Sequence, residues 1–147
     1  MKNPTYRIKQ AWFNLLNGQI GYNSQSVTVT REEGGKLPPS HYVIIRSGGS
    51  RREPVDQFMR RVTILIQVVT KFSSAEGVDD GVVEFIDEQI SNKALPTFVD
   101  DALTDGADFQ VTMVSNEEDF YETFEDTDKS IKYHVKTTRW EHLAVEK

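Results

Sequence analysis

The chain of 147 residues contains no cysteine, which excludes disulfide bonds and cysteine-ligated zinc. It also lacks any apolar run that approaches the roughly 20 residues needed to cross a bilayer, so no membrane partner is expected. The first twelve residues, MKNPTYRIKQAW, contain no long apolar stretch of the kind found in secretory signals. The sequence therefore predicts a single domain, residues 1–147, that is synthesised in the cytoplasm.

Basic residues are scarce in the second half of the chain. Between Asp100 and Asp128 there are eleven acidic residues and no Lys or Arg. Residues 1–72 hold 11 Lys and Arg against 4 Asp and Glu, whereas residues 73–147 hold 6 against 19. The net charge of −6 argues against general nucleic-acid binding, which needs clustered basic side chains. Either the two halves neutralise each other within one fold, or the basic face of one copy meets the acidic face of the next.

Motifs of catalysis and ligand binding are also missing. The three histidines, at positions 41, 134 and 142, do not have the spacing of a metal site. No GxSxG motif is present, and no serine has a companion base nearby in the sequence. Gly48 and Gly49 lie among arginines, but the spacing of a phosphate-binding loop and the helix that should follow it are absent. The sequence therefore predicts no enzymatic activity, no metal and no cofactor.

Hydrophobic periodicity predicts two helices and five strands. One helix is expected from Pro4 to Gly18 and another from Ser73 to about Lys93, with Ser73 and Glu76 as a capping box. The strands are expected at residues 26–31, 41–47, 58–72, 109–115 and 130–145. Loops are expected at residues 31–40, 47–57 and 116–129. The first three strands follow one another without a helix, which favours antiparallel pairing. The expected fold is α+β, with a mainly antiparallel sheet of about five strands packed by two helices.

The longest predicted strand, Phe58–Phe72, has two apolar faces. One face carries Val and Ile at alternate positions from Val62 to Val68, whereas the other carries Leu65 and Val69. The second face is covered either by further helices or by another copy of the chain. For the second alternative the candidate interface residues are Arg60, Arg61, Leu65, Gln67, Val69, Gly77 and Gly81. The two glycines are included because their spacing places them on one side of the second helix, where a neighbouring backbone could come close.

Two predicted loops contain candidate docking residues. The loop at 47–57 is flanked by Arg46 and carries Arg51 and Arg52, which suit an acidic protein surface or a small acidic ligand. The acidic loop at 116–129 carries Phe120, Tyr121 and Phe124, although a purely solvating linker rarely holds three aromatic residues. These six residues are predicted to contact partners.

The order of elements is helix, three strands, helix, two strands. The segments IKQAWFNLLNG, HYVIIRS after a proline-rich loop, RRVTILIQVVTKF and VVEFIDEQI occupy this order. In topology and composition, over nearly its whole length, the chain resembles the tail terminator, or tail completion, proteins of long-tailed bacteriophages. The long acidic segment before the last strand departs from that pattern.

The resemblance implies a structural virion protein of the tail or neck that assembles with itself into a ring, typically a hexamer. Such a ring caps the tail tube protein, binds the head–tail connector proteins and lets DNA pass without reading its sequence. An acidic pore lining, which would repel DNA, is a further expectation. The alternatives are another neck ring subunit, such as a head-closure or adaptor protein, or a monomeric α/β module that binds an acidic ligand.

Overall fold

The computed structural model describes residues 3–31, 41–53, 56–94 and 109–146 of the chain. Two helices and one main sheet make up this part, which confirms the predicted α+β class. The elements in chain order are α1 (Thr5–Leu16), β1 (Gly21–Tyr22), β2 (Gln25–Ser26), β3 (Thr28–Thr30), β4 (Tyr42–Glu53), β5 (Asp56–Ser73), α2 (Asp80–Ala94), β6 (Phe109–Asp126) and β7 (Ile131–Glu146). Within the described residues, neither helix is long and apolar enough to cross a bilayer.

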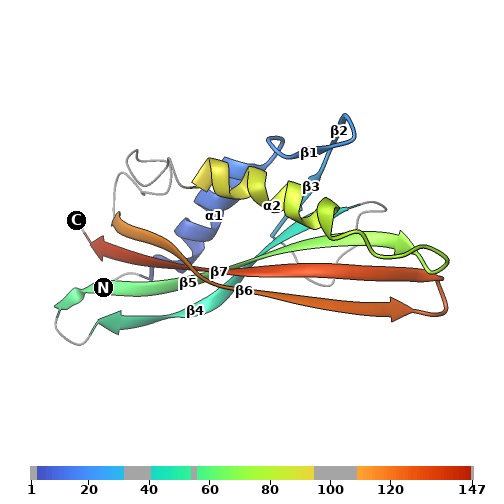
Figure 1. Ribbon diagram of the computed structural model, residues 1–147. Helices are drawn as coiled ribbons and strands as arrows, with labels where there is room; N and C mark the ends of the chain where they lie inside the picture. The colour runs from blue at the N-terminus through green and yellow to red at the C-terminus, as the bar shows by residue number, and fades with distance from the viewer. Residues whose placement is uncertain (1–2, 32–40, 54–55, 95–108, 147) are drawn as a thin grey trace.

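Five strands form the main sheet in the order β3-β4-β5-β7-β6 (Figure 1). The long neighbours are antiparallel, as predicted, whereas β1 and β2 form a separate small hairpin. The expectation of antiparallel pairing was wrong for β3, which lies parallel to the start of β4. Parallel neighbours need a long connection rather than a tight turn. The connection from β3 to β4 contains residues 31–40, where a loop was predicted. Apart from Arg31, these residues lie outside the described part of the chain.

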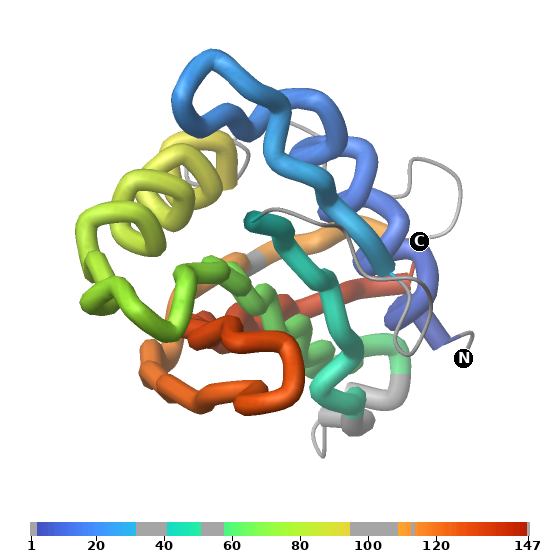
Figure 2. Tube along the Cα trace, turned by 90° about the vertical axis from the view of Figure 1, so that its right-hand side faces the viewer, coloured from blue at the N-terminus to red at the C-terminus, as the bar shows by residue number. Residues whose placement is uncertain are grey.

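The strand β5 lies at the centre of the sheet, and both helices pack on the same side of it (Figures 1 and 2). The alternating residues Val62, Ile64, Ile66 and Val68 are fully buried in one core cluster with the apolar faces of α1 and α2. The described part of the chain therefore does not have helices on both faces of the sheet. This side of the sheet is called the helix-covered face below.

Aromatic side chains anchor α1 in this core. The rings of Trp12 and Trp140 lie 5.1 Å apart between centroids, and both are buried. The indole Nε1 of Trp12 donates a hydrogen bond of 2.8 Å to Nε2 of His142. The other ring nitrogen of His142 lies 3.0 Å from the carbonyl oxygen of Val62, to which it donates. Since one nitrogen accepts and the other donates, the imidazole is neutral, and burial lowers its pKa to about 4.

The predicted loop at 47–57 was wrong, because β4 continues to Glu53 and β5 begins at Asp56. The two glycines that suggested a loop instead form an irregularity within the strand, where the pairing with β5 shifts between Ser47 and Gly49. Gly49 has a φ of 106°, which favours glycine. A β-carbon at Gly48 would lie 2.7 Å from the side chain of Thr63, so the two strands approach closely there.

The predicted loop at 116–129 was also wrong, because β6 runs to Asp126. Side chains on both faces of this segment contact β7, because Phe124 stacks on Tyr133 and Tyr121 stacks on His134. The high charge of the segment suggested a loop, and the segment has no regular alternation of polar and apolar residues that would indicate a strand. The prediction for β7 was confirmed, since the strand spans Ile131–Glu146.

The second helix begins later than predicted, at Asp80 rather than Ser73. β5 extends to Ser73, so the capping box expected from Ser73 and Glu76 is not formed. The carboxylate of Asp79 accepts a hydrogen bond of 2.8 Å from the backbone N–H of Gly81 and caps the helix instead.

Candidate functional site

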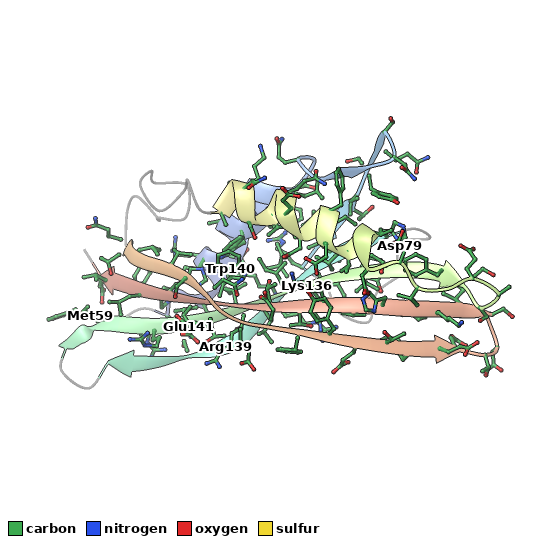
Figure 3. All side chains as sticks on the ribbon, viewed as in Figure 1. Met59, Asp79, Lys136, Arg139, Trp140 and Glu141 are labelled. Atoms are coloured by element: carbon green, nitrogen blue, oxygen red, sulfur yellow. The ribbon has the colours of Figure 1, made fainter. Side chains whose placement is uncertain are left out.

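The helix-free face is the side of the sheet opposite α1 and α2, where no described helix packs. Strand alternation places Leu65, Gln67 and Val69 of β5 on this face, together with Arg139 of β7. Figure 3 shows Arg139 on this side, whereas Lys136 and Trp140 of the same strand lie toward the helices. This face is the candidate functional site, because it contains several of the predicted interface residues.

A second apolar cluster occupies part of the helix-free face. It comprises Tyr42, Ile44, Val69, Tyr133 and Val135, all buried within the single chain. The side chain of Val69 is only 5 % exposed, so it offers little surface to a partner. The predicted interface residue Val69 is thus placed within the packing of this cluster.

Leu65 and Gln67 are half-buried on the same face. Gln67 donates a hydrogen bond of 3.2 Å to the hydroxyl of Thr137. Leu65 pairs with Arg46 on one side and with Arg139 on the other, so an apolar side chain lies between two cations. These residues keep surface that a partner could cover.

Two exposed aromatic residues of β6 extend the helix-free face. Phe120 is 39 % exposed and Phe124 is 51 % exposed, and the ring of Phe124 stacks on Tyr133 at 5.1 Å. Tyr121, between them, lies on the helix-covered face, where its hydroxyl donates to Glu84 of α2. The structure therefore places two of the three predicted docking aromatics together and the third apart from them.

The predicted basic docking residues belong to β4. Arg46, Arg51 and Arg52 all hold positions in that strand rather than in a loop. On the neighbouring β5, Arg60 donates to the hydroxyl of Ser50 at 2.9 Å, whereas Arg61 lines a groove. The basic and aromatic candidates thus belong to the two long strands at opposite sides of the sheet.

The groove beside Arg61 has a volume of about 290 Å³. Glu141 lies in it and is 5 % exposed. Its Oε1 accepts hydrogen bonds from Thr63 at 2.7 Å and from Arg139 at 2.9 Å, whereas its buried Oε2 has no partner among the described residues. The groove is polar and lined by Gly48, Gly49, Ser50, Arg61, Thr63, Arg139 and Glu141.

The two candidate interface glycines lie away from the helix-free face. Gly77 precedes α2, and a β-carbon there would meet open space. A β-carbon at Gly81, in the first turn of α2, would lie 3.0 Å from the carboxylate of Asp79. The structure therefore does not bring the glycines together with Leu65 and Gln67.

Sequence reasoning missed an ionic cluster beneath α2. The ammonium of Lys136 on β7 is buried and lies 2.7 Å from Oδ2 of Asp87 and 3.2 Å from Oε2 of Glu84. Oδ2 of Asp119 on β6 lies 3.9 Å away. The signal in the sequence was Asp87 itself, which interrupts the apolar stripe between Val83 and Ile90.

The protonation equilibria of this cluster follow from its burial and hydrogen bonds. Burial raises the pKa of the Asp87 carboxyl, although the Lys136 ammonium opposes that effect. The hydrogen bond from Tyr121 lowers the pKa of Glu84, and the same bond raises the pKa of Tyr121. Burial is the largest single influence on the pKa of Lys136 and lowers it. The hydrogen bond and charge of Asp87, together with the hydrogen bond to Glu84, outweigh burial, so the pKa of Lys136 is raised overall. The cluster is therefore an ion pair that joins α2 to the sheet.

The three histidines have separate environments. Nε2 of His134 lies 2.8 Å from Asp80, and its Nδ1 lies 2.8 Å from the hydroxyl of Thr123. His41 accepts a hydrogen bond from the backbone N–H of Lys71 at 3.0 Å, and burial lowers its pKa. Among the described residues, no group of acidic and histidine side chains has the arrangement of a metal site.

No protein-family model matches the chain, and no curated protein matches it.

Proposed function

We propose that this chain is a structural virion protein that assembles into a ring, caps a bacteriophage tail tube and joins it to the head connector, with DNA passing through. The observation that carries the proposal is the helix-free face of the long sheet. Half-buried Leu65 and Gln67 and exposed Phe120 and Phe124 lie on it, next to the apolar cluster around Val69. Exposed aromatic surface of this kind is typical of protein–protein contacts.

The order of helices and strands supports the proposed class. An N-terminal helix, strands ending in the long β5, a second helix and two last strands follow one another as in the tail terminators that the sequence resembles. The buried ion pair of Lys136 and Asp87 holds α2 on the sheet, which gives these charged groups a structural role. The specific assignment to the tail end rather than elsewhere in the neck rests on the resemblance.

Self-association and binding to tail tubes test this function. Native mass spectrometry and light scattering of the purified chain are expected to detect a closed oligomer, either alone or after addition of the cognate tail tube. Electron microscopy of the mixture is expected to show density at the tube end. A chain that remains monomeric and leaves tube ends bare would contradict the proposal.

A head-closure or adaptor subunit is the alternative within the same virion neck. Purified protein added in parallel to tails and to DNA-filled heads distinguishes the two, because a terminator binds tails and a head-closure subunit binds heads.

The groove beside Arg61 favours a second class of function, a monomeric module that binds an acidic ligand. Arg61 and Arg139 line that groove, and Arg51 and Arg52 follow it along β4. In that case, charge reversal at Arg51 and Arg52 would abolish ligand binding without altering the oligomeric state. A ring subunit would instead show a change in assembly.

A further inference from the structure

The sheet ends in two long strand edges. β6 pairs only with β7 among the described strands, and β3 covers only Tyr42–Ile44 of β4. Among the described strands, none pairs with the outer side of residues 116–126 of β6 or with the side of residues 47–53 of β4 that faces away from β5. The backbone N–H and C=O groups of such edges can pair with a strand from another chain.

The two edges carry opposite charge. Residues 45–53 of β4 contain three arginines and one glutamate. Residues 116–126 of β6 contain six acidic residues and no Lys or Arg. Two β6 edges would repel each other, as would two β4 edges, whereas β6 and β4 attract. Charges and bulges on edge strands often block pairing altogether, but here the charges block only the pairing of like edges.

The directions of the strands also suit a contact between unlike edges. Three antiparallel pairings separate β4 from β6, namely β4–β5, β5–β7 and β7–β6, so β4 and β6 run in opposite directions. If two copies stand side by side in the same orientation, β6 of one and β4 of the next are antiparallel. That pairing repeats the pattern of the long strands within each sheet.

We propose that β6 of one copy pairs with residues 45–53 of β4 in the next copy, so that the sheets of successive copies become continuous. The contact joins two different surfaces, which makes it heterologous, and such a contact closes into a ring when the rotation between copies permits. The inference rests on the proposed function, for which it supplies the contact between subunits. Residues 118–126 of β6 pair with β7 without a register shift and form the most regular part of that edge.

A charge swap tests the contact. One variant carries Glu117→Lys, Glu118→Lys, Glu122→Lys and Glu125→Lys on β6, which changes the net charge of residues 116–126 from −6 to +2. The other carries Arg51→Glu and Arg52→Glu on β4, which changes the net charge of residues 45–53 from +2 to −2. Each variant alone places like charges at every contact, so its apparent affinity for self-association is expected to fall about tenfold or more. In an equimolar mixture every contact again joins unlike charges, so assembly is expected to recover with the two variants alternating.

The matched control carries Asn14→Glu, Asn92→Glu and Lys93→Glu, at three exposed positions on α1 and α2 rather than on either edge strand. It has the same net charge as the β4 variant and is expected to assemble like the unmodified chain. Circular dichroism establishes that each variant is folded, and light scattering measures assembly. Failure of the mixture to recover, or equal loss in the control, would overturn the proposal.

Disulfide trapping provides a second measurement that does not depend on the charge variants. The chain has no cysteine, so one cysteine can be placed along residues 118–126 in one sample and another along residues 49–52 in a second. Disulfides need Cα atoms about 4.4–6.8 Å apart. Mixed samples are expected to form crosslinked pairs at a few matching positions, whereas either sample alone is expected to form none.

The outcomes for the contact and for the proposed function are distinguishable. Rings in the microscope without any β4–β6 crosslink would overturn the edge pairing and leave the ring function intact. Crosslinks between unlike edges in a protein that binds no tail tube would support the pairing and contradict the terminator function.

Discussion

Neighbouring residues of β5 lie in two different environments. Ile64 and Ile66 are fully buried on the helix-covered face, whereas Leu65 and Gln67 between them are half-buried on the helix-free face. One strand thus contributes to the core on one side and offers surface on the other. The long apolar strand therefore does not need helices on both sides. Its first face stabilises the subunit, and its second face is available for assembly.

The largest expected difference between the faces concerns ion pairs. Lys136→Met leaves Asp87 buried without its cation, which is expected to cost about 3–5 kcal/mol in the free energy of unfolding. Glu118 on the helix-free face lies 3.9 Å from Arg139, and both are exposed, so Glu118→Gln is expected to cost about 0–1 kcal/mol. Urea denaturation measures both values.

A matched double variant separates the effect of losing the ion pair on stability from the effect of leaving a buried charge unpaired. Lys136→Met combined with Asp87→Leu removes both charges, and stability is expected to recover most of the loss seen in the single variant. A double variant as unstable as Lys136→Met would contradict the role of Asp87 as the principal partner.

Truncation of adjacent β5 residues compares the faces directly. Ile66→Ala removes a fully buried side chain beneath the helices and is expected to cost about 2–5 kcal/mol. Leu65→Ala is expected to cost about 1 kcal/mol in stability but to weaken self-association, because its surface would be covered by another copy. Chemical denaturation and light scattering give the two quantities. Equal stability losses would mean that Leu65 is ordinary core.

The buried imidazole on the helix-covered face makes stability depend on pH. Because the pKa of His142 is about 4 in the fold and about 6.5 when unfolded, the unfolded chain binds the extra proton between these values. Stability therefore falls as pH decreases from 6.5 to 4, by roughly 3 kcal/mol from this group. Unfolding measured at pH 7 and pH 4.5 tests the slope. His142→Gln, which keeps an acceptor for Trp12, should show a smaller difference between the two pH values.

The smallest effects concern the aromatic residues of β6. Tyr121→Phe removes the hydrogen bond to Glu84 on the helix-covered face and is expected to cost about 0.5–1 kcal/mol. Phe120→Ser on the helix-free face is expected to change the unfolding free energy less than Tyr121→Phe while lowering self-association. Thermal unfolding and native mass spectrometry separate these effects. If Phe120→Ser instead destabilised the monomer and left assembly unchanged, the helix-free face would lose its assigned role.

The sequence predicted the elements whose periodicity is strong. β5 and β7 were expected nearly at their observed bounds, because their alternation continues over many residues. The prediction from sequence was wrong where a local pattern is compatible with either a loop or a strand. Gly48 and Gly49 suggested a loop but accommodate a bulge, and the acids of residues 116–126 suggested a loop but form an edge strand.

Tertiary pairing explains what the sequence could not show about the site. Leu65 and Gln67 were predicted on the second face of β5, and they lie there. The buried position of Val69 depends on Tyr42 and Tyr133, which are distant in the chain. Likewise, the face of β7 that carries Lys136 is charged, yet it packs against α2, because Asp87 and Glu84 provide partners there. No local pattern specifies such long-range partners.

Electron microscopy of the purified chain, alone and with tail tubes, shows whether the protein forms rings and caps tubes. Rings with a central hole, or caps at tube ends, are the predicted result. Monomers that form no ring and leave the tube ends bare would contradict the proposed assembly.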